Sequence, residues 1–71
     1  MSIQVVNVRN QFKGRVREII AGPVVSEVDV DTMAGPVTAV VTTRSIKELQ
    51  LAPGMEVLAL VKATEVSLAK L

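Results

Sequence analysis

Short runs of β-branched residues, each bounded by Gly and Pro, constrain the fold of this chain most. In VVSEVDVDT (24–32), small or apolar residues alternate with mostly acidic ones, and a period of two is typical of a half-buried strand. The run PVTAVVTT (36–43) is small or apolar on both sides, so we expect a strand covered on both faces. Val and Ile favour strands because branched side chains fit a pleated surface.

Turn signals divide the rest of the chain into similar pieces. AGP (21–23), MAGP (33–36) and APG (52–54) are predicted turns. They leave five predicted strands, at about 12–20, 24–32, 36–43, 56–62 and 65–70. Gly14 falls inside the first strand, where a glycine suggests a bulge or a bend, and Phe12 is expected to face the core.

One segment breaks the strand pattern. In SIKELQL (45–51), Ser45 is followed three residues later by Glu48, which is the signature of a capping box. We expect a helix of about two turns that ends before Pro53. Three strands, a helix and two strands is the order of an all-β, OB-fold-like five-stranded antiparallel barrel, and an SH3-like barrel is the main alternative.

Size and composition point to one small domain that associates with copies of itself. The chain has 71 residues, so we expect a single domain over 1–71, and such a domain buries only about 60% of its unfolded surface. It has no Cys and no His, which excludes disulfides and Cys/His zinc sites. Hydrophobic residues make up 49% and the mean hydropathy is +0.45. We interpret the apolar excess as subunit interface.

Several classes of function do not fit. The aliphatic runs are far shorter than the roughly 20 residues of a membrane span, and MSIQVVNVRN (1–10) does not resemble a signal peptide, so a cytoplasmic location is expected. The net charge is +1 and Phe12 is the single aromatic residue, whereas single-strand binding needs a basic groove with stacking aromatics. Without His, Cys, Tyr or Trp, no nucleophile has an evident base, so we expect no enzyme and no cofactor.

A small oxyanion fits the remaining polar residues better. Such an ion needs converging N–H and O–H donors and one or two cations. The chain offers two donor groups, NVRNQ (7–11) and VKATEV (61–66), and further hydroxyls at Thr38, Thr42, Thr43 and Ser45. The plainer alternatives are surface charges for Arg and Lys, strand propensity for the threonines, and a helix cap for the serine.

Three blocks also resemble a known family. VRNQFKGRV (8–16), VTAVVTTRSIKELQLAPG (37–54) and ALVKATEV (59–66) together are similar to the molbindins, which are small cytoplasmic molybdate-binding proteins built from the Mop-type or TOBE module. The family usually reads Ser-Ala-Arg-Asn-Gln-Leu-Lys-Gly in the first block and Lys-Ala-Thr/Ser in the third. With one module after Met1, this chain resembles the stand-alone storage type.

The resemblance implies a function and a set of ligands. It implies an OB-type barrel that binds molybdate, and usually tungstate, at the subunit interfaces of a homohexamer built as a trimer of dimers, with no metal bound directly by protein atoms. The matching positions are Arg9 with Val8 and Asn7, Lys62 with Ala63 and Thr64, and a hydroxyl of Thr42, Thr43 or Ser45. Val8 and Ala63 would act through backbone N–H groups. The first and third blocks are expected to form the two halves of one anion cradle, across a subunit boundary.

The chain departs from the family pattern at two of these positions. Asn7 stands where the family usually has Ser, and Val8 stands where it usually has Ala, so the contacts of the first block differ from the family's. The leading hypothesis is an oxyanion store or buffer that catalyses no reaction. The alternatives are a nucleic-acid-binding OB module and a purely structural oligomerisation module.

Overall fold

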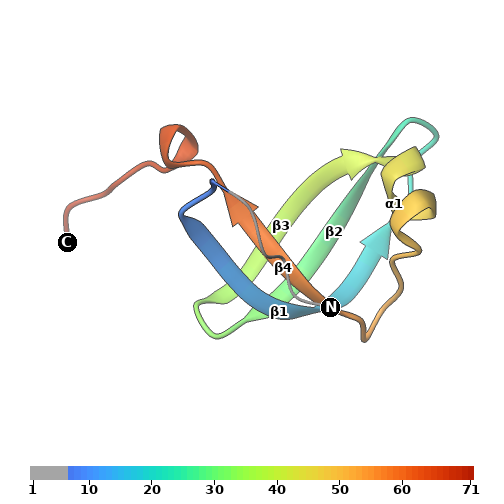
Figure 1. Ribbon diagram of the computed structural model, residues 1–71, viewed down its shortest axis with the longest axis horizontal. Coiled ribbons are helices and arrows are strands. Elements are labelled where there is room, and N and C mark those ends of the chain that lie inside the picture. The colour runs from blue at the N-terminus through green and yellow to red at the C-terminus, as the bar shows by residue number, and fades with distance from the viewer. Residues whose placement is uncertain (1–6) are drawn as a thin grey trace.

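The fold is a single curled antiparallel sheet with a short helix at one end (Figure 1). A computed structural model describes residues 7–71. Its strands are β1 (Asn10–Ile20), β2 (Val25–Thr32), β3 (Gly35–Thr42) and β4 (Glu56–Val61), in the sheet order β3-β2-β1-β4. The helix α1 (Thr43–Leu49) lies between β3 and β4, and a 3-10 turn, η1 (Ala63–Glu65), follows β4. An all-β fold with one helix after the third strand is therefore confirmed.

The predicted alternation decides which face of each strand is buried. Val16 of β1 pairs with Val30 of β2, and both are buried together with Val28. The acidic residues of β2 alternate with these valines and lie on the outer face, where Arg17 forms an ion pair with Asp31 at 3.3 Å. The core of the described residues is small, and partly buried side chains of α1 and β4 pack against it.

A bulge bends β1, but not at the predicted residue. The pairing with β2 shifts between Val16 and Glu18, which leaves Arg17 as the extra residue. Gly14 lies in regular register with both neighbouring strands. A glycine is needed there for a different reason, because a Cβ would lie 2.3 Å from the carbonyl oxygen of Asp31. The bulge suggested for Gly14 lies instead at Arg17, and close approach of β2 explains this glycine.

The helix begins three residues earlier than predicted. Thr42 is its N-cap, and the hydroxyl of Thr42 accepts the backbone N–H of Ser45 at 3.1 Å. Ser45 is therefore inside the helix, and the capping box that starts at Ser45 is not formed. The helix ends at Gln50, which has a φ of 53°, and left-handed residues commonly terminate helices. Pro53 follows as expected.

The fifth strand is absent from the described residues. Residues 65–70 were predicted as a strand, but η1 occupies 63–65 and the following residues leave the body of the molecule without regular structure (Figure 1). The sheet is consequently a half-barrel, in which β3 and β4 are edge strands. The five-strand count is not confirmed, because η1 follows β4 and the residues after it pair with no strand in the part of the chain that the structure describes.

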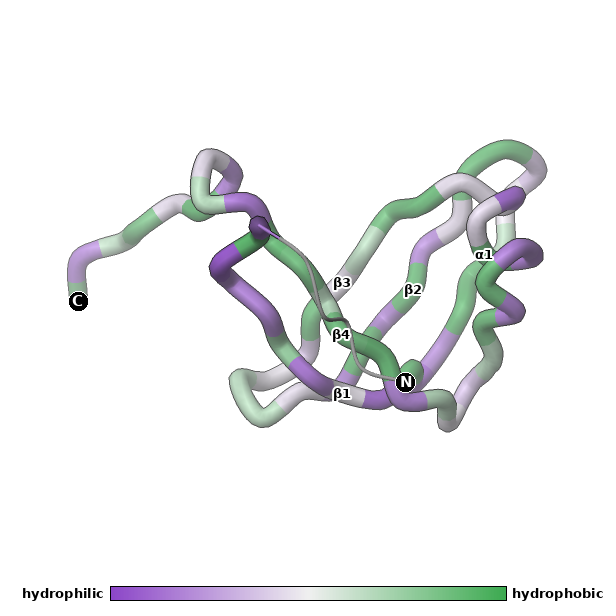
Figure 2. Tube along the Cα trace, viewed as in Figure 1, coloured by the Kyte–Doolittle hydropathy of each residue, from purple (hydrophilic) through white to green (hydrophobic). Residues whose placement is uncertain are grey.

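Many apolar side chains remain exposed in this half-barrel. Val40 of β3 is 69% exposed, so β3 is not covered on both faces within one chain. Figure 2 shows long apolar stretches along β3 and β4, whereas polar positions are frequent in β1. None of the helices within residues 7–71 is long and apolar enough to span a membrane. The expectation about a signal peptide falls largely on residues 1–6, which lie outside the described residues.

Candidate functional site

The first and third polar blocks meet at one end of the sheet. β1 starts where β4 ends, and Asn10 pairs with Val61 in the β1–β4 ladder. Arg9 and Lys62 are the next residues along the chain on either side of that pair. Antiparallel pairing thus brings together two segments that are about fifty residues apart. The two blocks were expected to meet across a subunit boundary, whereas this pairing brings them to the same end of the sheet within one chain.

Two amide side chains fix the backbone at this end. Asn10 donates from Nδ2 to the carbonyl oxygen of Val61 at 3.1 Å, and Gln11 donates from Nε2 to the carbonyl oxygen of Val8 at 2.7 Å. The first bond ties the start of β1 to the residue that precedes Lys62. The second folds the segment before β1 back on itself. The side-chain amides of Asn10 and Gln11 therefore already donate to backbone carbonyl groups. The prediction that counted them among the donors for a ligand was too broad.

The cationic and small residues at this end are accessible. Asn7 and Arg9 are exposed, Val8 is half-buried, and these three line a shallow polar hollow with Gln11. Lys62, Ala63 and Thr64 are also exposed, but they do not line that hollow. The η1 turn is closed by the N–H of Glu65, which donates to the carbonyl oxygen of Lys62 at 2.9 Å. One chain therefore brings both halves of the predicted cradle to one place without closing it.

The third group of predicted ligands lies at the opposite end of the sheet. Thr42 pairs with Val25 at the start of β2, and β2 starts beside the end of β1. The length of β1, roughly 30 Å at 3.3 Å per residue, separates this region from Asn10. Thr42, Thr43 and Ser45 are therefore not brought together with Arg9 and Lys62 in one copy of the chain.

Most of these hydroxyls already have structural partners. Thr43 donates from Oγ1 to the carbonyl oxygen of Gly22 at 2.7 Å, and its oxygen lies 2.7 Å from the hydroxyl of buried Ser26. The hydroxyls of Thr42 and Ser45 lie 2.7 Å apart. Since one of these two hydroxyls donates to the other, only one proton of the pair is free for a ligand. The N-cap role of Thr42 and the hydrogen bonds of Thr43 with Gly22 and Ser26 explain these two hydroxyls without a ligand.

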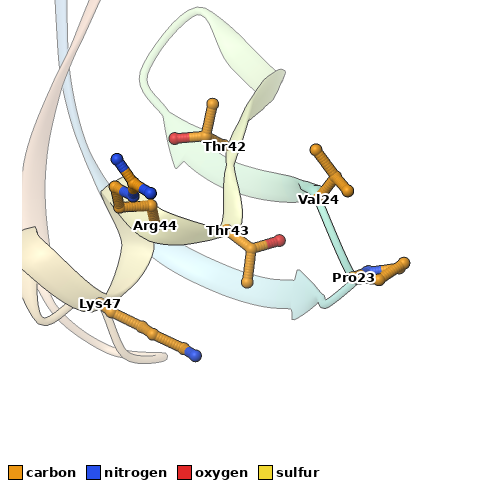
Figure 3. A pocket seen from close by; sticks show the side chains of 6 residues that line it. All are labelled: Pro23, Val24, Thr42, Thr43, Arg44 and Lys47. Carbon is orange, nitrogen blue, oxygen red and sulfur yellow. The ribbon is translucent and has the colours of Figure 1, made fainter.

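A pocket beside α1 carries two further cations. It is lined by residues before β2 and at the start of the helix: Pro23, Val24, Thr42, Thr43, Arg44 and Lys47. Figure 3 shows that the side chains of Arg44 and Lys47 point to different sides of the ribbon. They do not converge on one point, so within a single chain this pocket does not form a cradle for a small anion.

Acidic residues do not supply a metal site. No group of three or more potential metal-binding side chains occurs within residues 7–71. The carboxylates of Asp31 and Glu56 form exposed ion pairs with Arg17 and Lys13, and Asp29 accepts a hydrogen bond from the Thr38 hydroxyl. The carboxylates named here are thus held on the outer face of the sheet and do not gather into a ligand set.

A family model covers the strands and the polar blocks alike. The TOBE domain model matches residues 7–68. The chain belongs to the TOBE domain family. The match includes both ends of the sheet, so the resemblance of the three blocks is confirmed at the level of the family.

Named relatives make the likeness more specific. MopB of Rhodobacter capsulatus, a molybdenum-pterin-binding protein, is 45% identical over 64 residues, which are 89% of this chain and 24% of that protein. This TOBE chain therefore spans about a quarter of the length of that relative. A molybdate-binding protein from Sporomusa ovata has a solved structure with a TM-score of 0.89 and 36% identity, and the match covers 94% of this chain and all of that one.

A third likeness is to a longer protein. The cytoplasmic molybdate-binding protein ModG, solved with molybdate bound, has a TM-score of 0.82 and 33% identity. The match covers 87% of this chain and 45% of that one. The half-barrel with one helix is thus a fold found in solved molybdate-binding proteins.

Proposed function

We propose that this TOBE chain binds molybdate, and also tungstate, as an intact oxyanion, and that it serves as a store or buffer in the cytoplasm. The observation that supports the proposal is the β1–β4 pairing, in which Asn10 pairs with Val61; Arg9 and Lys62 are the residues next to this pair along the chain. The names of MopB, the Sporomusa ovata protein and ModG support the choice of ligand. No bond is made or broken, so the protein is not an enzyme.

The chemistry of the shell follows from the donors at this end. Arg9 supplies a planar fork and Lys62 a point charge, which together offset the two negative charges of the ion. Backbone N–H groups of Val8 and Ala63, with the side chains of Asn7 and Thr64, supply neutral donors. Sulfate has the same shape and charge but is smaller, so discrimination depends on the size of the closed cavity.

The site is completed by a second copy of the chain. The hydroxyls of Thr42, Thr43 and Ser45 lie at the far end of the sheet, so a hydroxyl from this group reaches the anion only across a subunit boundary. The small core and the exposed apolar residues favour assembly for an independent reason. The proposed assembly is a homohexamer, a trimer of dimers, of one domain over residues 1–71.

Thermal unfolding of the wild type and of Lys62→Ala tests the site. A ligand that binds only the folded state at a hundred times its Kd stabilises it by about 2.7 kcal/mol, which corresponds to a rise in Tm of roughly 10 °C or more for a domain of this size. We expect this rise with molybdate for the wild type and no rise for Lys62→Ala.

The matched control is Lys13→Ala. It removes the same charge from another exposed lysine, but Lys13 forms only an exposed ion pair with Glu56, which is worth less than about 1 kcal/mol. This variant should keep the full rise in Tm. An undiminished rise in Lys62→Ala would show that the anion binds elsewhere, and no rise in the wild type would exclude the function.

A further inference from the structure

A serine interrupts the valines on the core face of β2. Ser26 alternates with Val28 and Val30 along the strand, and all three side chains are buried. Within residues 7–71, Ser26 is the only polar residue that is buried, with 3% exposure. A buried hydroxyl lowers stability unless it is hydrogen-bonded, whereas a valine would continue the pattern without that cost. The bonds of Ser26 therefore indicate what this serine does.

Ser26 belongs to a closed ring of three hydrogen bonds. The N–H of Gly22 donates to the hydroxyl oxygen of Ser26 at 3.1 Å, and the Thr43 hydroxyl donates to the carbonyl oxygen of Gly22 at 2.7 Å. The hydroxyl oxygens of Ser26 and Thr43 lie 2.7 Å apart. Because the one proton of the Thr43 hydroxyl is already used, Ser26 is the donor in this bond. The ring joins the turn after β1, the strand β2 and the first residue of α1.

The ring fixes Thr43 and leaves this residue no hydroxyl proton for a ligand. The backbone N–H of Thr43 also donates, to the carbonyl oxygen of Val24 at 2.8 Å. Figure 3 shows the hydroxyl of Thr43 turned toward the segment before β2, whereas the hydroxyl of Thr42 points to a different side. Of the hydroxyls at positions 42, 43 and 45, only the bonded pair of Thr42 and Ser45 therefore keeps a proton for the anion.

This hydroxyl pair depends on its neighbour for its position. Thr42 is exposed and is the last residue of the edge strand β3, and the next residue, Thr43, is held by the ring. We propose that Ser26 is a positioning residue for the oxyanion site. Through Thr43, it holds the pair of Thr42 and Ser45 where one hydroxyl donates to an anion at the cationic end of a second copy. Ser26 itself is buried and does not touch the anion.

This inference rests on the proposed function, because it requires that the hydroxyl pair completes the anion site. Titration calorimetry with molybdate compares the wild type with Ser26→Ala and Ser26→Cys. Both variants lose the strong hydroxyl donor, since a thiol is only a weak one, and the cysteine also fills the space of the serine. We expect the Kd to rise about tenfold in both, which is the effect of losing one hydrogen bond to a charged partner. Should Ser26→Ala not assemble in light scattering, Ser26→Cys decides by the same comparison.

Thr32→Ala is the matched control. The hydroxyl of Thr32 donates to the carbonyl oxygen of Gly35 at 2.7 Å and accepts the N–H of Ala34 at 3.1 Å. Its loss therefore also removes one donated and one accepted bond, but at the other end of β2. A purely structural role lowers the Tm and leaves the Kd, measured well below the Tm, unchanged. We expect Thr32→Ala to behave in this way, whereas the Ser26 variants lower the Tm and also raise the Kd.

Amide hydrogen exchange of the ligand-free protein tests the positioning directly. The N–H of Ser45 donates to the Thr42 hydroxyl at 3.1 Å, so its exchange rate reports whether the hydroxyl pair keeps its geometry. We expect faster exchange of this N–H in the Ser26 variants and the wild-type rate in Thr32→Ala. An unchanged rate in the Ser26 variants would overturn the positioning role.

The titrations separate failure of this role from failure of the function. A wild type that binds molybdate and Ser26 variants with the same Kd would overturn the positioning role and leave the proposed function intact. A rise in Kd no larger than that of Thr32→Ala would overturn it as well, because general destabilisation then explains the effect. No binding by the wild type would overturn the proposed function and the positioning role together.

Discussion

Neighbouring polar residues at the start of β1 have different roles. Asn10 is half-buried and bonded to the carbonyl oxygen of Val61, whereas Arg9 is exposed beside it. The role of Asn10 is to position the backbone that carries Lys62. In the proposed site, Arg9 meets the anion. Arg9 lies just before β1, whereas Asn10 is paired within the sheet, which explains why these adjacent residues are used so differently.

Asn10→Ala tests this positioning role. The substitution removes one hydrogen bond worth about 1 kcal/mol, so we expect the affinity for molybdate to fall about fivefold while the protein stays folded and assembled. Titration calorimetry measures the affinity, and light scattering measures the assembly. Thr38→Ala is the control, because it also removes a hydrogen bond, to Asp29, but from the exposed face of β3. Equal affinities of the Asn10→Ala variant and the wild type would exclude the role.

Single-residue roles were the part least predictable from the sequence. The motifs indicated Arg9 and Lys62 as the cations. In the structure, both residues lie at the same end of the sheet, next to the pair formed by Asn10 and Val61. The motifs did not separate Asn10 from Asn7, because both are asparagines in one polar run and only the pairing of β1 with β4 shows which of them has a partner. Gly14 was recognised as special, but the cause was assigned to a bulge rather than to the carbonyl oxygen of Asp31.

At the scale of elements, the start of the helix shows that two nearby hydroxyl residues compete for the N-cap position. Ser45 and Glu48 have the spacing of a capping box, but Thr42 provides a cap one turn earlier. Both residues are hydroxyl-bearing, and the sequence pattern alone does not decide between them. The strand that precedes the helix decides, because β3 ends at Thr42 with extended backbone.

A pair of substitutions distinguishes the two caps. Thr42→Ala should lower the free energy of unfolding by about 1 kcal/mol, as is typical for the loss of an N-cap side chain. Ser45→Ala leaves the cap in place and should cost less than about 0.5 kcal/mol. Urea denaturation followed by circular dichroism measures both. A larger loss for Ser45→Ala than for Thr42→Ala would restore the capping box.

The strands were predictable to within about two residues because the period-two pattern and the Gly-Pro turns agree. β2 and β3 begin and end within one residue of the predicted bounds. The fifth strand was not found, although VSLAKL has strand-like composition. A strand needs a partner strand, and within the described residues of one chain the segment 66–71 pairs with none. Composition indicates strand propensity but not the chain with which a strand pairs.

At the scale of the whole molecule, one chain is incomplete in two respects. Within residues 7–71 its hydrophobic core contains three buried valines, and its cationic blocks and its group of hydroxyls at 42–45 occupy opposite ends of the sheet. The proposed association of copies would remedy both, because it would cover exposed apolar side chains and bring hydroxyls from one chain to the cations of another. The apolar excess in the composition predicted association, but it did not indicate which surfaces meet.

Titration calorimetry of the wild-type protein with molybdate, and separately with sulfate, tests the central claim most directly. We expect saturable heat with molybdate, the same behaviour with tungstate, and much weaker binding of sulfate. Binding is expected to disappear in Lys62→Ala and to persist in Lys13→Ala. No heat with molybdate at any protein concentration, in a sample that light scattering shows to be assembled, would contradict the account and leave a purely structural oligomerisation module.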